Sequence, residues 1–178
     1  LVSLIKAARQ AGIELMLDGA FSHTGDDSVY FDRRGVYAGD GAYRSPESPY
    51  RAWYEFYAWP DSYRCWWGFK TLPEVNECEP SYREYIGRMI GHYAKLGISS
   101  WRLDVADELP DDFIAFLRRR VKRDDPEGML LGEVWEDASN KISMGCQRNY
   151  AMGHELDSAM GYPFREAVCD FLMYRTDA

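Results

Sequence analysis

The chain has 178 residues, 46% of them hydrophobic, and a formal net charge of −8. This length and apolar content suffice for a folded core and differ from the composition of a disordered chain. The acidic balance disfavours nucleic acid as a partner, because phosphate backbones bind clustered Lys and Arg, and no apolar stretch approaches the roughly 18 residues that would predict a membrane partner.

The first half of the chain predicts a helix, a strand and a long irregular segment. Residues 1–12 predict a helix that ends at Gly12. Residues 13–18 predict an apolar strand that ends in Asp18. From residue 19 to about 80 the chain is rich in Gly, Pro, Ser, Asp and aromatic residues, with little periodicity. Because this stretch is too long for a loop without structure of its own, we expect an inserted subdomain.

The second half alternates helices with strands. Ser81 and Glu84 have the spacing of a capping box at the start of the first helix. The alternation implies a parallel sheet covered by helices, and both a doubly wound sheet and a (β/α)8 barrel fit it. No glycine-rich phosphate-binding motif is present, which disfavours a nucleotide-binding sheet. The predicted elements are a helix over 81–97, a strand over 98–106, a helix over 110–125, a strand over 128–135, a strand over 154–160 and a helix over 162–174.

Three of the predicted strands end in acidic residues, which are Asp18, Asp104 and Glu133. Parallel strands end at one edge of a sheet, and in barrels that edge carries the active site. Asp104 and Glu133 are one strand-helix-strand repeat apart, so we expect them on neighbouring strands, about 4.8 Å apart. Retaining glycoside hydrolysis uses two carboxyl groups about 5–5.5 Å apart, one as nucleophile and the other as acid and then base.

Two basic side chains accompany these acids. Arg102 lies two residues before Asp104, so both side chains lie on the same face of the strand. A guanidinium group keeps a neighbouring carboxylate ionised, as a nucleophile requires, although a purely structural Arg–Asp pair fits the spacing equally well. His23 follows Asp18 in the next loop, where substrate contact and a structural role are both open.

Four separated blocks resemble the α-amylase family of glycoside hydrolases, and together they cover essentially the whole chain. They occur in the family's order and at predicted strand ends. The resemblance implies a partial (β/α)8 TIM barrel with about strands three to six, in which 1–18 and 81–178 are barrel parts and 19–80 is the domain B insertion after strand three. The blocks are "LDGAFSHTG" (17–25), "LPEVN" (72–76), "WRLDVADEL" (101–109) and "LLGEVWED" (130–137).

The resemblance implies a role for each residue of the predicted edge. Asp104 matches the family's nucleophile, which forms a β-glycosyl-enzyme intermediate, and Glu133 matches the general acid/base. Arg102 matches the arginine that keeps the nucleophile ionised. His23 matches a histidine that hydrogen-bonds the sugar at the point of cleavage, and Asp18 matches an acid that supports the arginine.

Three more residues are candidate substrate contacts, each with a weaker basis. Trp66 in the insertion could stack on glucose or belong to the core. Trp135 is expected to pack beside Glu133 and to raise its pKa by desolvation. At positions 107 and 108 typical α-amylases carry Lys and His, which contact sugar beyond the cleavage point. This sequence carries Asp107 and Glu108 there, and an acid at 108 is more similar to cyclomaltodextrinases, neopullulanases and amylopullulanases.

Neither a metal nor another cofactor is expected. Ser22 stands where many family members carry an Asn that binds calcium, and a neutral hydroxyl is a poorer ligand for this cation. The four cysteines form no CxxC pair and no Cys/His cluster with metal-ligand spacing, so we expect free thiols in a reducing compartment.

We therefore expect a retaining hydrolase of α-1,4 glucosidic bonds, with α-1,6 bonds open, in maltodextrins or related α-glucans. A transglycosylase and a non-catalytic carbohydrate-binding relative are the alternatives, and the presence of both carboxylates disfavours the second. The expected partner is an α-glucan oligosaccharide or polysaccharide, and a homodimer of the full-length protein stays open.

The ends of the chain suggest a piece of a longer protein. The first residue is Leu rather than Met, and the last residues form an unfinished helical pattern. The family's last block, a His-Asp pair that supplies a third carboxylate after strand seven, is not in this sequence. We expect truncation at both ends, an inactive fragment, and a cytoplasmic protein with secretion left open.

Overall fold

The computed structural model describes residues 1–175, and the contacts within it divide the chain into two compact units. One unit comprises residues 1–19 and the chain from Ile90 onward, and the other comprises Ala20–Met89. The first boundary lies where the sequence predicts the start of an insertion. The second lies inside a helix, beyond the predicted end at about residue 80.

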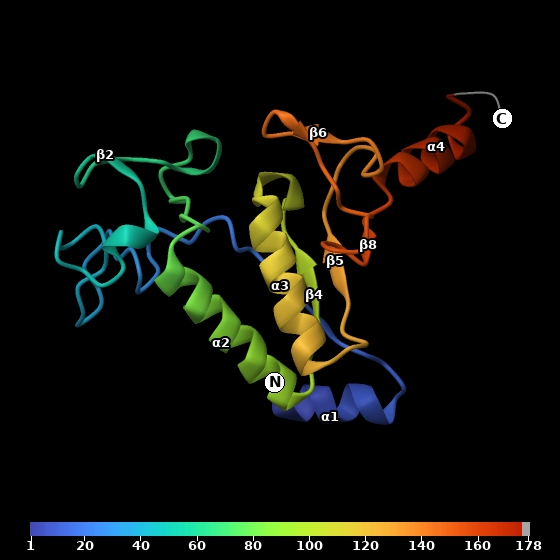
Figure 1. Ribbon diagram of the computed structural model, residues 1–178, viewed down its shortest axis with the longest axis horizontal. Helices are drawn as coiled ribbons and strands as arrows, with labels where there is room; N and C mark the ends of the chain where they lie inside the picture. The colour runs from blue at the N-terminus through green and yellow to red at the C-terminus, as the bar shows by residue number, and fades with distance from the viewer. Residues whose placement is uncertain (176–178) are drawn as a thin grey trace. The chain divides into compact units, whose positions relative to one another are not determined.

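The order of helices and strands along the chain follows the predicted alternation (Figure 1). The elements are α1 (Val2–Gln10), β1 (Met16–Gly19), η1 (Arg51–Trp53), β2 (Phe56–Ala58), β3 (Ser62–Tyr63), η2 (Trp66–Gly68), α2 (Pro80–Leu96), β4 (Ser100–Leu103), η3 (Ala106–Glu108), α3 (Asp111–Asp124), β5 (Leu130–Gly132), β6 (Ile142–Ser143), β7 (Cys146–Gln147), β8 (Ser158–Ala159) and α4 (Tyr162–Leu172).

A four-stranded sheet in the order β1-β4-β5-β8 forms the centre of the first unit. All three neighbouring pairs are parallel, which confirms the parallel sheet. Asp18 pairs with Arg102 in the register of β1 and β4, and Leu103 pairs with Gly132 between β4 and β5. The carboxyl ends of β1, β4 and β5 therefore lie side by side.

Helix α3 covers this sheet along β4 and β5 (Figure 1). Its apolar face is buried, and it ends at Asp124 after a basic last turn, as its charge pattern predicts. Arg118 on the same helix pairs with Asp157 next to β8, at 2.7 Å. The buried residues of α3 are Phe113, Ile114, Leu117 and Val121.

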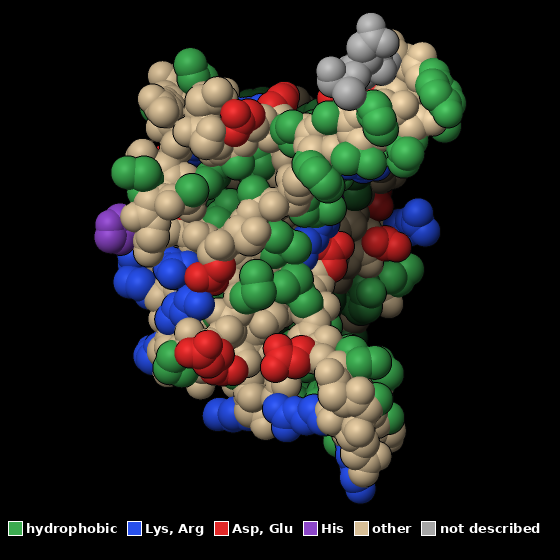
Figure 2. Space-filling model, turned by 90° about the vertical axis from the view of Figure 1, so that its right-hand side faces the viewer, with side chains coloured by type: hydrophobic (Ala, Val, Ile, Leu, Met, Phe, Trp, Pro, Cys, Tyr) green, Lys and Arg blue, Asp and Glu red, His purple; other side chains and the backbone are tan. Residues whose placement is uncertain are grey.

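Helix α4 differs from α3 because none of its residues is buried. Figure 2 shows hydrophobic side chains gathered on this helix. Those with large exposed apolar surface are Phe164, Val168, Phe171 and Leu172. None of the helices in residues 1–175 is long and apolar enough to span a bilayer, and the four cysteines are free thiols, as predicted.

The unit Ala20–Met89 has a core of packed aromatic rings. Phe31 is fully buried, with its ring centroid 4.9 Å from that of Tyr54 and 4.8 Å from that of Tyr63. Trp53 packs against Tyr82 of α2 at 5.1 Å. Because the first turns of α2 contribute rings to this core, the unit boundary lies within the helix.

The capping box predicted at Ser81 and Glu84 does not form. Helix α2 begins at Pro80, so Ser81 is already inside the first turn. The Glu79 carboxylate accepts the Ser81 N–H at 3.2 Å and its hydroxyl at 2.8 Å. Glu84 instead pairs with Arg88 one turn further along the helix. The acidic residue that satisfies the helix start thus lies before it.

Burial raises the pKa of Glu77, in the same unit, to about 7, while the charges of Arg64 and Arg83 oppose the shift. The folded protein then holds a proton that the unfolded chain releases near pH 4.3, so this group lowers stability as pH rises from there to about 7. We expect Glu77→Gln to raise the melting temperature by about 2–4 °C at pH 8 and to change it little at pH 5. Calorimetry at pH 8 and pH 5 would test this, and an equal change in melting temperature at the two pH values would contradict it.

Candidate active site

The acidic residues at the three strand ends gather around one guanidinium group. Nη1 of Arg102 donates to Asp18 at 2.7 Å and to Asp104 at 2.6 Å. Nη2 of the same side chain lies 2.7 Å from Oε2 of Glu133. The structure therefore brings together four of the residues that the sequence singles out.

Backbone hydrogen bonds fix these positions. Asp104 directly follows β4, and its N–H donates to the Gly19 carbonyl at 3.1 Å. Glu133 directly follows β5, and its N–H donates to the Leu103 carbonyl at 3.0 Å. Both residues thus continue the hydrogen bonding of the parallel sheet by one step, which places their side chains beside Arg102.

The four side chains differ in exposure. Glu133 is the most buried, at 10% side-chain exposure, followed by Arg102 at 21% and Asp104 at 25%. Asp18 is 66% exposed. Water therefore screens the contribution of Asp18 more than those of Asp104 and Glu133.

Glu133 receives hydrogen bonds from three directions besides Arg102. The Val105 N–H donates to Oε2 at 3.0 Å, the Tyr162 hydroxyl donates to Oε1 at 3.0 Å, and the Trp135 indole also donates to the carboxylate. Burial alone would raise the pKa of Glu133, but these donors and the charge of Arg102 together lower it. In this structure Glu133 is an ionised acceptor.

Arg102 is correspondingly held in its charged form. Burial alone would lower the pKa of its guanidinium, but hydrogen bonds to Asp18 and Asp104 and the charge of Glu133 raise it above its usual value. The three acids thus share one permanent positive charge.

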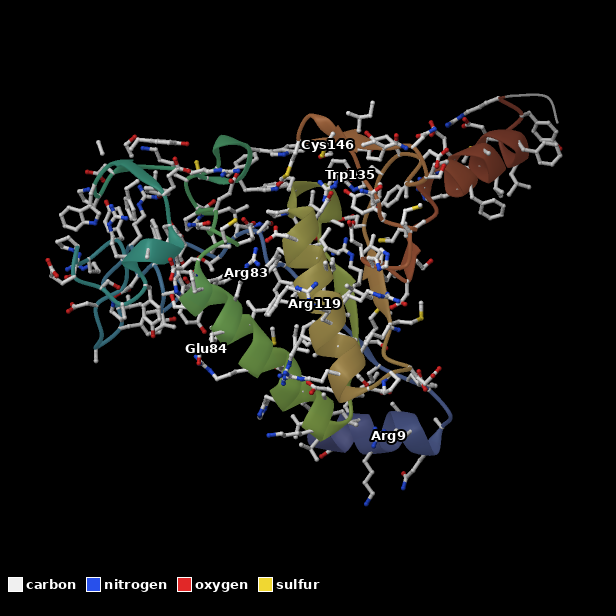
Figure 3. The ribbon with its side chains drawn as sticks, viewed as in Figure 1. Arg9, Arg83, Glu84, Arg119, Trp135 and Cys146 are labelled. Atoms are coloured by element: carbon white, nitrogen blue, oxygen red, sulfur yellow. The ribbon has the colours of Figure 1, made fainter. Side chains whose placement is uncertain are left out.

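The predicted effect of Trp135 on Glu133 is wrong in sign. The prediction is that Trp135 desolvates the carboxyl group and raises its pKa, whereas its hydrogen bond lowers the pKa of Glu133. Trp135 lies just beyond the carboxyl end of β5 (Figure 3), and 41% of the residue is exposed. An exposed indole removes little water but still brings its N–H to the carboxylate.

Tyr162 is the contact that the sequence reasoning missed. It is the first residue of α4, three positions beyond β8. The rule that identifies the acids, proximity to the carboxyl end of a parallel strand, applies to this residue as well. A search for any polar side chain at these ends, rather than for acids alone, would have found it.

We expect Tyr162→Phe to raise the pKa of Glu133, because the ionised carboxylate loses one donor while the ring is kept. A carboxyl group whose folded pKa is lowered stabilises the protein above its unfolded pKa, and loses that effect as pH falls through the folded value. The variant should therefore lose stability near neutral pH and little in strong acid. Carbon NMR titration of the Glu133 carboxyl gives the pKa, and an unchanged or lower value would contradict the prediction.

His23 and Trp66 lie together in the unit Ala20–Met89. Their ring centroids are 5.7 Å apart. The Ser22 hydroxyl is 3.0 Å from Nδ1 of His23, and His23 forms an isolated antiparallel bridge with Glu74. Backbone pairing and a neighbouring hydroxyl thus hold His23 beside an indole.

Two other predictions concern Glu108 and metal binding. Glu108 ends the short helix η3 after β4 and is half-buried. Within residues 1–175, no group of three or more His, Cys, Asp or Glu side chains has an arrangement that could hold a metal ion. Ser22 is buried and its hydroxyl is engaged by His23.

This arrangement of two carboxylates can support nucleophilic and acid–base chemistry. One guanidinium group contacts both Asp104 and Glu133, and this geometry is compatible with the separation of about 5–5.5 Å used in retaining glycoside hydrolysis. The two acids also differ in environment, because Glu133 receives a backbone N–H and two side-chain donors. Different surroundings are what allow two carboxyl groups to take different roles.

Comparison with known proteins gives a consistent result. The family model described as "Alpha amylase, catalytic domain" matches residues 1–176. Among curated proteins, the amylopullulanase of Thermoanaerobacter thermohydrosulfuricus is 34% identical over 196 residues, covering 96% of this chain and 12% of the relative. The cyclomaltodextrinase of Thermoanaerobacter pseudethanolicus is 31% identical, covering 97% of this chain and 29% of the relative.

A solved structure agrees in fold. The debranching enzyme of Nostoc punctiforme is similar with a TM-score of 0.77 and 32% identity, covering 92% of this chain and 32% of that protein. This chain thus spans about a third or less of the length of the proteins that it resembles.

Proposed function

Because the chain belongs to the α-amylase catalytic-domain family, we propose that it supplies the reacting carboxylates of a retaining glycoside hydrolase that acts on α-glucans. Its sheet is part of the family's α/β barrel. The observation that carries the proposal is the contact of one guanidinium, that of Arg102, with both Asp104 and Glu133. The proposed bonds are α-1,4 and α-1,6 glucosidic bonds in maltodextrins and related glucans.

In the proposed reaction Asp104 attacks the anomeric carbon while Glu133 protonates the leaving oxygen. Arg102 places its positive charge beside the attacking carboxylate of Asp104. The product of the first step is a β-glycosyl ester of Asp104. Glu133 then takes a proton from water, and the water oxygen attacks the anomeric carbon, displaces the Asp104 carboxylate and releases the sugar with its original α configuration.

The acid role places a requirement on Glu133. In the structure its pKa is lowered, so it holds no proton in neutral solution. A bound sugar excludes water from the carboxyl group, and desolvation disfavours the charged form. The proposal therefore requires substrate binding to raise the pKa of Glu133 until it can protonate the leaving oxygen.

The remaining assignments belong to the same proposal. We infer that His23 and Trp66, whose ring centroids lie 5.7 Å apart, contribute to sugar binding, because an aromatic ring has an apolar body and a polar edge that suit a sugar ring. The segment 19–80 corresponds to domain B, and Glu108 is a candidate contact beyond the cleavage point. The chemistry of the partner follows from the family: an α-glucan oligosaccharide or polysaccharide.

The stereochemistry of the product tests the mechanism. The complete natural protein, incubated with a maltodextrin, should release α-anomers first, as followed by proton NMR before mutarotation. Initial release of β-anomers would contradict the proposal, because it would require direct attack by water. Pullulan and a cyclic maltodextrin assayed in parallel distinguish α-1,6 from α-1,4 cleavage.

Two other outcomes would redirect the assignment. Transfer of the glycosyl group to a sugar acceptor in preference to water, measured as longer products at high substrate concentration, would identify a transglycosylase. Tight binding of maltodextrin with no bond cleavage would identify a carbohydrate-binding relative. The presence of both carboxylates around Arg102 favours hydrolysis over the second of these.

A further inference from the structure

The turn after β4 holds a strained residue that contacts Glu133. Val105 has φ 42° and ψ 60°, in the left-handed region. A β-branched side chain is disfavoured there and persists only where the surroundings enforce it. The Val105 N–H donates to Oε2 of Glu133 at 3.0 Å, and the next N–H, of Ala106, donates to the Glu133 carbonyl at 3.0 Å. The strained conformation thus directs a donor at this carboxylate.

Contacts to Asp107, two residues after Val105, hold the turn in place. Its carbonyl accepts the Ser143 hydroxyl at 2.8 Å and Nη1 of Arg148 at 3.0 Å. Its carboxylate accepts the Tyr150 hydroxyl at 2.7 Å and pairs with Nζ of Lys141 at 3.1 Å. All four partners come from residues 141–150, which include the β6–β7 hairpin. We call these four contacts the Asp107 anchor.

The interior of the anchor is well buried. Arg148 is 3% exposed, and its Nη2 also donates to the Leu109 carbonyl at 2.6 Å. Its Nε pairs with Asp111 at 2.5 Å. Tyr150 is 1% exposed, and burial together with Asp107 raises the pKa of its hydroxyl, which therefore stays a neutral donor. A buried set of partners fixes the turn more firmly than exposed contacts would.

Lys141 connects the anchor to the second loop of the site. Its ammonium group pairs with Asp107 and also with Glu136. Asp107 lies three positions after Asp104, and Glu136 lies three positions after Glu133. Burial alone would lower the pKa of Lys141, but the two carboxylates raise it, so the ammonium stays charged. One cation thus links the loops that follow the two proposed reacting acids.

We propose that Asp107 and Lys141 are positioning residues for Glu133: their ion pair holds the turn after β4 in the strained conformation that directs the Val105 N–H at the Glu133 carboxylate. The inference deepens the proposed function, on which its catalytic meaning rests.

Three other groups face Glu133 from outside the Asp107–Lys141 pair. Arg102 faces the carboxylate from β4, Tyr162 from α4 and Trp135 from the loop after β5. Asp104 and Asp18 lie on the other side of the Arg102 guanidinium. Because Lys141 also pairs with Glu136, next to Trp135, the signal of the Val105 amide identifies which donor to Glu133 has changed.

The test uses the complete natural protein and a mutant cycle. The variants are Asp107→Asn, Lys141→Met and the double variant, with Lys141→Arg to restore the charge. Lys122→Met is the matched control. Lys122, on α3, pairs with Asp157 at 3.1 Å, the same distance as between Lys141 and Asp107, and it contacts none of the proposed reacting acids. The readouts are the pH dependence of kcat/KM and the thermal unfolding temperature.

Loss of the Val105 N–H raises the pKa of Glu133, so the alkaline limb of the kcat/KM profile, set by the acid, moves to higher pH. We expect an upward shift of about 0.5–1 pH unit in each single variant. The double variant should shift no further, since both changes remove one interaction. Lys141→Arg should restore the limb, and Lys122→Met should leave it in place. Unchanged limbs, with activity falling only as the unfolding temperature falls, would overturn the proposal.

A second measurement keeps this result separate from the proposed function. In protein labelled with nitrogen-15 valine, the Val105 amide should follow the titration of Glu133, and its midpoint should rise in Lys141→Met. This measurement needs no turnover. If the wild-type protein cleaves no glucan, the proposed function is wrong, and the amide signal still tests the positioning inference. A Val105 amide with the same shift and midpoint in both proteins would end the inference.

Discussion

Asp104→Ala should reduce kcat/KM of the complete protein for a maltodextrin by about 10⁴–10⁶-fold, the loss typical when a nucleophile is removed. The reason is that no other carboxylate of the group can take its place. Asp18 is 66% exposed on the neighbouring strand, and Glu133 is held by Val105, Tyr162 and Arg102. Initial rates over a range of pH would measure the loss.

The stereochemistry of chemical rescue separates the role of Asp104 from that of Glu133. The substrate is α-glucosyl fluoride, whose fluoride leaves without an acid. In Asp104→Ala, azide should attack the anomeric carbon of this substrate from the face that the carboxylate vacates and give β-glucosyl azide. In Glu133→Gln, azide should instead attack the β-glycosyl ester of Asp104 and give α-glucosyl azide. Glu133→Gln should slow natural substrates by about 10²–10⁴-fold, as expected for a general acid.

A matched control is available at another carboxylate of the same unit. Asp125 accepts the Ser99 hydroxyl at 2.5 Å, at the start of the predicted strand that contains β4. Ser99 precedes β4 and Asp104 follows it. Asp125→Ala therefore removes a hydrogen-bonded carboxylate at the end of the strand opposite to Asp104. It should leave kcat/KM within about twofold. The same azide anomer from both active-site variants, or more than about 1% residual activity in Asp104→Ala, would contradict the roles assigned here.

The strand-end acids could be predicted because the inference needs only local pattern and topology. Apolar stretches followed by Asp18, Asp104 and Glu133 alternate with helices, and parallel strands place their carboxyl ends together. The contacts of Arg102 follow from the same pattern, since residues two apart on a strand share a face. These predictions depend on backbone geometry, which sequence periodicity specifies well.

The hydrogen-bond partners could not be predicted in the same way. Tyr162 reaches Glu133 from a helix that begins 29 residues later, and four side chains from residues 141–150 converge on Asp107. The left-handed conformation of Val105 has no sequence signal, because Val is among the residues least suited to it. Such contacts depend on side-chain positions that the pattern of strands and helices leaves open.

Two smaller predictions were wrong about the kind of interaction that a residue makes. Ser81 has the spacing of a helix cap, but the Glu79 carboxylate takes that role. Trp135 was expected to act on Glu133 through desolvation, but its indole donates a hydrogen bond. In both cases the residue lies where the sequence predicts, and the sign or identity of its interaction differs.

Arg102→Met should lower kcat/KM by about 10²–10³-fold, because the variant leaves three neighbouring carboxylates without their shared positive charge. The loss of the guanidinium raises the pKa of Glu133 and removes the positive charge beside the attacking carboxylate of Asp104. The alkaline limb of the kcat/KM profile, set by Glu133, should accordingly move to higher pH. Arg102→Lys should recover only part of the rate, since a single ammonium cannot reproduce the forked contact of Nη1 and Nη2.

Arg118→Met separates this electrostatic effect from a loss of stability. Arg118 has the same 21% exposure as Arg102 and pairs with Asp157 at the same 2.7 Å, but it lies on α3 and contacts none of the three acids. Both variants should lose stability of about 1–3 kcal/mol, because each removes a charged hydrogen-bond donor from a partly buried carboxylate. Only Arg102→Met should lose turnover and shift the alkaline limb. If Arg102→Met keeps its rate within tenfold while unfolding at the same lowered temperature as Arg118→Met, Arg102 is a structural ion pair and the electrostatic basis of the proposed nucleophile is wrong.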